Sequence, residues 1–299
     1  MRIAVTVITL VLLAGCGSAV ARPQAARHSP RPPAVRGTTT PSASPSPVPA
    51  QIVVRGLGTV HVPILMYHYI GDVSPHDPNP QLSAGLTVSA DMFRQQMAWL
   101  AANGYRPVTM AALRGYLQGA NDLPAKPVAL TFDDGYADFY STAFPVLSQY
   151  HFTATTFIIS GFIDDANGHS MRSWQLVAIN QAGIEIGAHT FNHPDLTTLS
   201  PTQVQGQLGP SKATLEHLVG KPVLDFAYPA GRYDAAVVAA VEGAGYQSAV
   251  TTQPGTTHGL ADRFTWTRQE VLGTESLQAF TQQLGPTDPT ISAVPHWAP

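Results

Sequence analysis

Two histidines and two carboxylates are the residues of this sequence whose types and spacing could do chemistry together. His189 and His193 are four residues apart, a spacing that brings two imidazoles to a common point on one helical turn or tight loop. Asp133 and Asp134 follow an apolar run, where adjacent carboxylates are costly unless they are paired, hydrogen-bonded or bound to a cation. Neither pair is specific alone, because most histidines are ordinary polar residues and Asp-Asp-Gly is also a plain turn.

Taken together, these four side chains predict a catalytic metal site. Two histidines and one carboxylate form a three-ligand site with positions open for water, which is the pattern of a catalytic rather than a structural metal. The second carboxylate is then free to act as a general base. Adjacent residues on a strand point in opposite directions, so we expect a turn beginning at Asp134 to aim both carboxylates inward.

Strands and helices alternate through the region that must position these residues. We predict strands over residues 62–67, 128–133, 154–159, 184–188, 224–228, 247–251 and 265–271. Helices are predicted over residues 89–103, 110–117, 139–149, 173–182, 201–219, 234–245 and 276–284, with caps such as Ser89 and Ser200. Repeated strand–helix units favour a parallel sheet with helices outside, and no glycine-rich phosphate fingerprint follows the first strand. We therefore expect a barrel-like α/β fold with its chemistry at the strand ends.

Three motifs follow one another along the chain, at residues 131–136 (TFDDGY), 187–193 (GAHTFNH) and 226–231 (FAYPAG). In this order they resemble the motifs of the polysaccharide deacetylases of carbohydrate esterase family 4, also called the NodB-homology domain, within a match over roughly residues 62–272. The lead-in at residues 63–68 (PILMYH) resembles the branch that acts on exported poly-N-acetylglucosamine. The resemblance implies a distorted (β/α) barrel, with a single catalytic domain over residues 52–285.

The same resemblance implies a role for each residue of the proposed centre. A divalent metal, usually zinc, would be held by Asp134, His189 and His193, and Asp133 would be the base that acts on its water. Arg268 matches the arginine of a late Arg-x-x-Val segment and would pair with Asp133.

Two further roles follow from the resemblance, with departures from the family pattern. The backbone N–H of Ala230 would help hold the oxyanion, although many members have tyrosine there and arginine at the position of Ala227. His68 resembles the general acid of the poly-N-acetylglucosamine branch. No clear late Leu-x-His motif is present, and His258, which we place in a Gly/Thr-rich loop, is the competing candidate.

The expected reaction is hydrolysis of N-acetyl groups on a cell-surface or extracellular polysaccharide that contains N-acetylglucosamine, with release of acetate. Poly-N-acetylglucosamine and peptidoglycan both present that acetamide. Aromatic side chains that could stack on sugar faces are Tyr69, Tyr136, Phe191 and Trp174. Two alternatives stay open: an O-acetyl xylan-type esterase, and a lipoprotein that binds carbohydrate without catalysis.

Composition and charge exclude several other classes. Of the 299 residues, 12% are charged and 44% are hydrophobic, which excludes overall disorder and a long charged coiled coil. Residues 1–51 hold five arginines and no acid, whereas the remainder holds 11 basic and 19 acidic residues and carries −8. A net charge of −8 over residues 52–299 argues against nucleic acid as a ligand. Because Cys16 is the only cysteine, internal disulfides and thiolate metal cages are excluded.

The amino terminus is typical of an exported lipoprotein. Residues 1–15 form a short signal peptide, because their apolar run is too short to span a bilayer. Residues 13–16 (LAGC) resemble a bacterial lipobox, which implies cleavage before Cys16 and a lipid anchor on the outer face of the cell membrane; ordinary secretion is the alternative. Residues 16–51 are rich in Pro, Ser, Thr and Ala and are predicted to be a disordered tether, and residues 286–299 an irregular tail.

Overall fold

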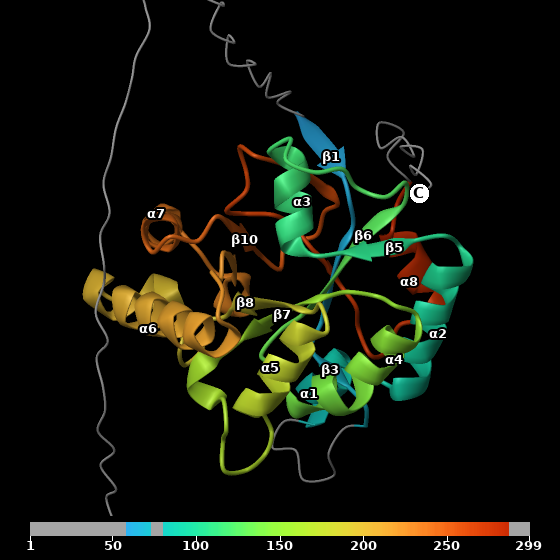
Figure 1. Ribbon diagram of the computed structural model, residues 1–299, viewed down its shortest axis with the longest axis horizontal. Coiled ribbons are helices and arrows are strands. Elements are labelled where there is room, and N and C mark those ends of the chain that lie inside the picture. The colour runs from blue at the N-terminus through green and yellow to red at the C-terminus, as the bar shows by residue number, and fades with distance from the viewer. Residues whose placement is uncertain (1–57, 73–79, 287–299) are drawn as a thin grey trace, which may run out of the picture. The chain divides into compact units, whose positions relative to one another are not determined.

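The computed structural model describes residues 58–72 and 80–286 (Figure 1). The predicted signal peptide over residues 1–15, the tether over residues 16–51 with Cys16, and the tail beyond residue 286 lie outside the described residues. No helix in the described part is long and apolar enough to cross a membrane.

The centre of the fold is an eight-stranded parallel sheet. Its strands lie in the order β10-β9-β8-β7-β6-β2-β12, and β5 pairs with the beginning of β6. The sheet contains β2 (Ile64–Tyr67), β5 (Arg106–Val108), β6 (Pro127–Phe132), β7 (Thr155–Ile158), β8 (Glu185–Ala188), β9 (Asp225–Ala227), β10 (Ser248–Val250) and β12 (Gln269–Glu270). Every residue of β6 is buried, as expected for a parallel strand that is covered on both faces.

One segment near the end of the described chain joins the two edges of this sheet. Val250 of β10 forms a bridge with Trp266, while Glu270 of β12 pairs with Met66 of β2. The backbone N–H of Thr251 donates to Trp266 O, and that of Val271 donates to Met66 O, both at 2.9 Å. Residues 266–271 thus close the curled sheet into a ring, and the predicted distorted (β/α) barrel is confirmed.

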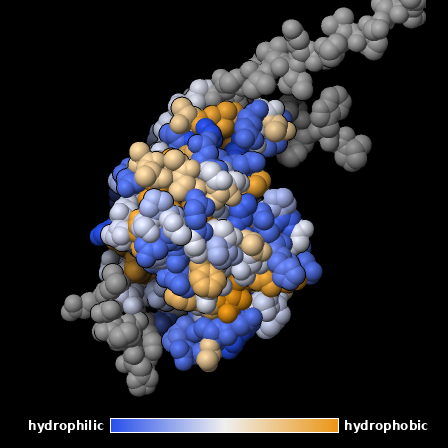
Figure 2. Space-filling model, turned by 90° about the vertical axis from the view of Figure 1, so that its left-hand side faces the viewer, coloured by the Kyte–Doolittle hydropathy of each residue, from blue (hydrophilic) through white to orange (hydrophobic). Residues whose placement is uncertain are grey.

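Helices surround the strands (Figure 1). They are α1 (Pro80–Leu86), α2 (Ala90–Ala102), α3 (Met110–Leu117), the π-helix η1 (Phe139–Ala143), α4 (Phe144–Gln149), α5 (Ser173–Gln181), α6 (Pro201–Val219), α7 (Ala235–Gly243) and α8 (Leu277–Gln283), with short 3₁₀ turns η2 (Ser160–Phe162), η3 (Leu196–Thr198) and η4 (Pro229–Gly231). Both predicted caps are confirmed: Ser89 Oγ accepts from Met92 N, and Ser200 forms a capping box with Gln203. The face seen in Figure 2 is mostly hydrophilic with separate hydrophobic patches, as expected for amphipathic outer helices.

Side chains that alternate along the strands pack into two separate clusters. Leu65 of β2 and Leu130 of β6 belong to the larger cluster, which also contains residues of the surrounding helices. Ile64 and Ala129, their neighbours in the chain, belong to the smaller cluster together with Trp266 of the closing segment. The period of two therefore separates a helix-facing layer from the barrel interior.

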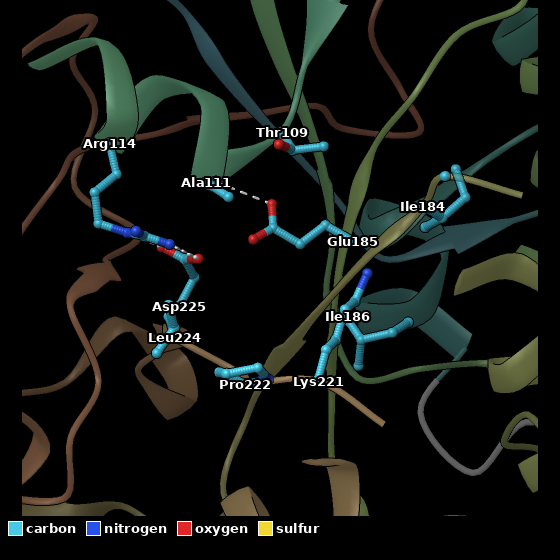
Figure 3. Close-up of a pocket in the computed structure, with 11 residues that line it drawn as sticks. Thr109, Ala111, Arg114, Ile184, Glu185, Ile186, Lys221, Pro222, Leu224 and Asp225 are labelled. Atoms are coloured by element: carbon cyan, nitrogen blue, oxygen red, sulfur yellow. Dashed lines mark hydrogen bonds and ion pairs between the residues drawn. The ribbon is translucent and has the colours of Figure 1, made fainter. Parts of the chain in front are cut away.

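A polar cluster lies at the amino ends of β8 and β9, beside a cavity of about 220 Å³ (Figure 3). Arg114 of α3 donates to both carboxylate oxygens of Asp225, at 3.2 and 2.9 Å. Glu185 accepts from the backbone N–H of Ala111 at 3.1 Å and from Thr155 Oγ1 at 2.9 Å. These contacts fasten α3 to the strands at the end of the barrel opposite to the strand carboxyl ends, where stability is the usual role.

Each of the seven predicted strands and seven predicted helices has a counterpart, most of them within two residues of the predicted ends. The exceptions are the strand predicted over residues 265–271, which is reduced to β12, and the helix predicted over residues 139–149, which is divided into η1 and α4. The sequence patterns did not show β5, α1, or the small pairs β3 (Tyr69–Ile70) with β4 (Thr87–Val88) and β1 (Thr59–His61) with β11 (Thr257–Gly259). The loop placement of His258 was wrong, because this residue lies in β11 and pairs in register with Val60.

Candidate active site

A cavity of about 490 Å³ lies at the carboxyl ends of the strands. The sequence predicted that chemistry-bearing residues gather at this edge, and most of them line the cavity. The lining residues are His68, Tyr69, Ser83, Leu86, Asp133, Asp134, Tyr136, His189, His193, Tyr228, Ala230, Thr252 and Glu270.

Asp134, His189 and His193 converge on one point in this cavity. One ligand atom of each lies within 4.8 Å of those of the other two. Asp134 Oδ1 is 3.4 Å from His189 Nε2 and 3.6 Å from His193 Nε2. This oxygen is buried and has no hydrogen-bond partner, an arrangement that is costly unless another group completes it.

A left-handed backbone turn explains how two adjacent aspartates face the same cavity. Asp134 has φ 71°, a conformation that is uncommon outside glycine, and it follows directly after β6. His193 and Ala230 also have positive φ, 60° and 51°. Such strained residues persist only where the surrounding structure fixes them, and here three of them line one cavity.

A backbone carbonyl holds the imidazole of His189, and a threonine hydroxyl holds the backbone of His193. His189 Nδ1 donates to Ala227 O at 2.7 Å, and its other ring nitrogen, Nε2, lies 3.4 Å from Asp134 Oδ1. The backbone N–H of His193 donates to Thr190 Oγ1 at 2.8 Å. A fixed tautomer with its far nitrogen bonded to a carbonyl is the arrangement that metal-ligating histidines show.

The pKa shifts of Asp134 and His193 favour the forms that bind a cation, whereas for His189 burial lowers the pKa but contact with Asp134 and the charge of Asp133 outweigh it and raise that pKa. Burial raises the pKa of Asp134, but contact with His189 and the charge of the histidines outweigh it and hold that pKa well below its usual range. Burial and the neighbouring His189 lower the pKa of His193. A carboxylate and a neutral imidazole are the forms that bind metals.

The three residues therefore fit a divalent metal. They supply two nitrogens and one oxygen, the donor set of three-ligand catalytic sites, and the unpartnered Asp134 Oδ1 lies within 3.6 Å of both imidazole nitrogens.

Asp133 lies beside this cluster but is bonded to an arginine. Arg268 Nη1 and Nη2 donate to its two carboxylate oxygens at 2.8 and 2.7 Å. Arg268 is fully buried and is itself fixed by Thr251 O and Thr131 Oγ1. Burial raises the pKa of Asp133, but the guanidinium of Arg268 outweighs this and lowers it, so the group is a carboxylate at neutral pH.

The two histidines considered as general acids lie in different surroundings. His68 follows β2 and lines the cavity together with Asp133 and Asp134. His258 is fully buried, is absent from the cavity lining, and donates from Nε2 to Val62 O at 3.0 Å. Burial lowers the pKa of His258 to about 4.

The four aromatic residues predicted to contact sugar divide into two pairs. Tyr69 and Tyr136 line the cavity and stack on each other with ring centroids 3.8 Å apart. Phe191 and Trp174 do not line it; Trp174 is 59% exposed and packs edge-on against Tyr140. The cause is their position on the loop after β8 and on α5, outside the rim of this cavity.

Several lining residues were missed in the sequence. Ser83 and Leu86 belong to α1, which no periodic pattern revealed. Tyr228 lies inside the third motif, and Glu270 lies two residues after Arg268. Strand alternation from Arg268 could have indicated Glu270, because side chains two apart on a strand share one face.

The chain is similar to a known protein family and to solved structures. Residues 120–249 match the family model described as polysaccharide deacetylase. The structure of the Streptococcus pyogenes deacetylase PplD in complex with acetate is 32% identical, with a TM-score of 0.69, and the similarity covers 76% of this chain and 99% of that one. The structure of IcaB from Ammonifex degensii is 25% identical, with a TM-score of 0.63, and the similarity covers 76% of this chain and 98% of that one.

Sequence relatives agree with the structural ones. The protein YxkH of Bacillus subtilis (strain 168) is 36% identical over 194 residues, which are 65% of each chain. The poly-beta-1,6-N-acetyl-D-glucosamine N-deacetylase of Escherichia coli (strain K12) is 32% identical over 121 residues, which are 36% of this chain and 18% of that enzyme. The chain thus spans less than two thirds of the length of either relative.

Proposed function

Because the chain belongs to the polysaccharide deacetylase family, we propose that it is a hydrolase that removes N-acetyl groups from a polysaccharide containing N-acetylglucosamine and releases acetate. The observation that carries this proposal is the joint position of Asp134, His189 and His193 in one cavity, with Asp133 beside them. Among the candidate polymers we favour poly-N-acetylglucosamine over peptidoglycan, since relatives named as N-deacetylases of that polymer are 32% identical over 121 residues and 29% identical over 133 residues.

Asp134, His189 and His193 would hold the divalent cation, for which we propose zinc. Such a cation supplies Lewis-acid polarisation of a carbonyl oxygen and makes hydroxide available near neutral pH. The contribution of the protein is to fix the ligands before substrate arrives, through the bond from His189 to Ala227 O and the left-handed turn at Asp134.

Asp133 would accept a proton from the attacking water on a carboxylate oxygen. Its pKa is lowered by Arg268, which keeps the oxygens unprotonated and fixes their direction through two hydrogen bonds. Arg268 is not itself one of the residues that line the cavity, but it contacts Asp133, which is, so it positions the base rather than the substrate.

Two further groups would act on the acetamide itself. The backbone N–H of Ala230 is suited to donate to the developing oxyanion, because the left-handed conformation of this residue turns the backbone at the cavity wall. His68 would donate a proton to the departing nitrogen. Tyr69 and Tyr136 offer aromatic surface for a sugar ring at the same cavity.

Acetate release separates this function from its alternatives. The parent protein is incubated with a β-1,6-linked N-acetylglucosamine oligomer, with a peptidoglycan fragment and with O-acetylated xylan, each with and without a chelator. The proposal requires chelator-sensitive acetate release from an N-acetylated substrate. Release from the xylan alone would indicate an esterase, and no release from any of them would favour a non-catalytic carbohydrate-binding protein.

We further propose that the protein is lipid-anchored at Cys16 on the outer face of the cell membrane. Support comes from the lipobox-like residues 13–16 and the single cysteine. Metabolic labelling with a fatty-acid analogue should label the parent and not Cys16→Ser. Equal labelling, or release of the parent into the medium, would contradict the anchor and favour secretion.

A further inference from the structure

Glu270 brings a carboxylate to the cavity that the proposed reaction does not use. It lies in β12 and is exposed, and its side chain has no basic partner among the described residues. Its register partner is Met66 of β2, and His68 follows two residues later in the chain. Glu270 therefore lies in the cavity wall on the side of His68.

Strand alternation explains why this carboxylate faces the cavity. Arg268, two residues earlier, directs its guanidinium to Asp133 and Thr131. Side chains two apart on a strand share a face. Glu270 therefore lies on the same face as Arg268, two residues closer to the cavity. Residues 266–271 thus carry the buried Arg268, which fixes the proposed base Asp133, and two residues later the carboxylate of Glu270.

Among the carboxylates that line the cavity, Glu270 is the one with no ion pair among the described residues. Asp133 is matched by Arg268, and Asp134 is matched by the histidines. No lysine or arginine of residues 58–72 and 80–286 lines the cavity. A free carboxylate at such a rim attracts a cationic group on the ligand.

We propose that Glu270 binds the protonated amine of a glucosamine unit next to the acetamide that is being hydrolysed, so that the preferred substrate is a partly de-N-acetylated polymer. This inference rests on the proposed function, because that reaction converts neutral acetamides into amines along the same chain. An amine created in one turnover would then be recognised in the next, and an anionic polymer would be disfavoured.

The size of the effect follows from the exposure of Glu270. Ion pairs in contact with solvent contribute modestly, so we expect a preference of about two- to five-fold for the amine at low salt. The preference should decrease with ionic strength, because salt screens exposed charges.

The test uses the metal-loaded full chain and three β-1,6-linked tetramers: fully acetylated, with one free amine, and fully de-N-acetylated. We expect kcat/KM to be about two- to five-fold higher for the mono-amine tetramer, and the fully de-N-acetylated tetramer to inhibit. Glu270→Gln should abolish the preference and weaken that inhibition by a similar factor. The matched control is Glu242→Gln. Glu242 is an exposed glutamate of α7 that pairs with Arg263, and its substitution should change neither the preference nor the inhibition.

Two results would overturn the inference. One is a parent enzyme that releases acetate from both substrates with equal kcat/KM; the other is a preference that Glu270→Gln retains in full. Failure of the proposed function looks different, because then the parent releases no acetate from any tetramer. In that case, binding of the fully de-N-acetylated tetramer, measured by calorimetry, still reports whether Glu270 recognises an amine.

Discussion

Arg268 donates hydrogen bonds to both carboxylate oxygens of Asp133, at 2.8 and 2.7 Å, from a position that is fully buried. The arginine belongs to residues 266–271, which join the two edges of the sheet. Closure of the barrel and orientation of the proposed base therefore depend on the same short segment.

The first prediction concerns this pair. Arg268→Ala leaves a buried carboxylate without its partner, which costs about 3–5 kcal/mol, and should lower the free energy of unfolding in urea by that order. Arg268→Lys keeps the charge but loses the two-pronged contact, so it should recover part of the stability and still show reduced kcat. Arg114→Ala is the control, because it breaks a similar buried pair with Asp225 at the opposite end of the barrel.

If Arg268→Lys retained the parental kcat, the positioning role would be contradicted. A merely structural role predicts that both arginine variants lose stability and that the folded fraction of each keeps its kcat.

The second prediction concerns the base. Asp133→Asn keeps the size of the side chain and removes the proton acceptor, so acetate release should decrease by about 100-fold or more. Metal content should stay at the parental level, because Asp133 is not one of the three converging ligands. Acetate release at the parental rate would show that another group takes the proton.

The third prediction distinguishes the two histidines. His68 lines the cavity, so His68→Ala should lose about 100-fold in kcat and keep a melting temperature close to that of the parent. His258 is buried and bonded to Val62 O, so His258→Ala should lose stability while the folded protein remains active. The opposite pattern in the two variants would make His258 the acid.

The fourth prediction concerns pH and the polar cluster at the amino ends of the strands. Burial, followed by the charge of Asp225, raises the pKa of Glu185 well above its usual value. A raised carboxyl pKa means that the folded state favours the proton. The stabilising contribution is therefore complete below the ordinary pKa of about 4.3 and is lost as pH rises through the raised value.

Glu185→Gln should remove this loss, because glutamine still offers an oxygen to Ala111 N and Thr155 Oγ1 and cannot ionise. Melting temperatures of parent and variant should agree near pH 4 and separate toward neutral pH, with the variant higher. Curves that separate in the acidic range instead, with agreement at neutral pH, would contradict the raised pKa.

The barrel could be predicted from local patterns, whereas the separate small sheet of β1 and β11 could not. Apolar runs such as residues 128–132 and caps such as Ser89 act over a few residues, so they are visible in the sequence. The pairing of β1 with β11 joins residues about 200 positions apart, and nothing in the Gly/Thr-rich stretch around His258 indicates a partner. Burial of His258 is a tertiary property, which explains why the sequence left two candidate acids.

In the candidate site too, some residues could be predicted from the sequence and others only from the fold. The types and order of Asp133, Asp134, His189 and His193 predicted a shared centre, and their motifs provided the family. Glu270 is a variable position of the Arg-x-x-Val segment, so no motif indicated it, and alternation from Arg268 together with the register of β12 with β2 places it at the cavity. Trp174 has the side chain of a sugar contact, but its position on α5 depends on how that helix packs.

The central claim is that Asp134, His189 and His193 together hold one divalent cation. Its most direct test is the metal content of purified protein, measured by mass spectrometry for the parent and for His193→Ala, alongside acetate release. We predict about one divalent ion per chain in the parent, and loss of both the ion and the activity in the variant. A His193→Ala protein that keeps its ion at the parental level would contradict the claim.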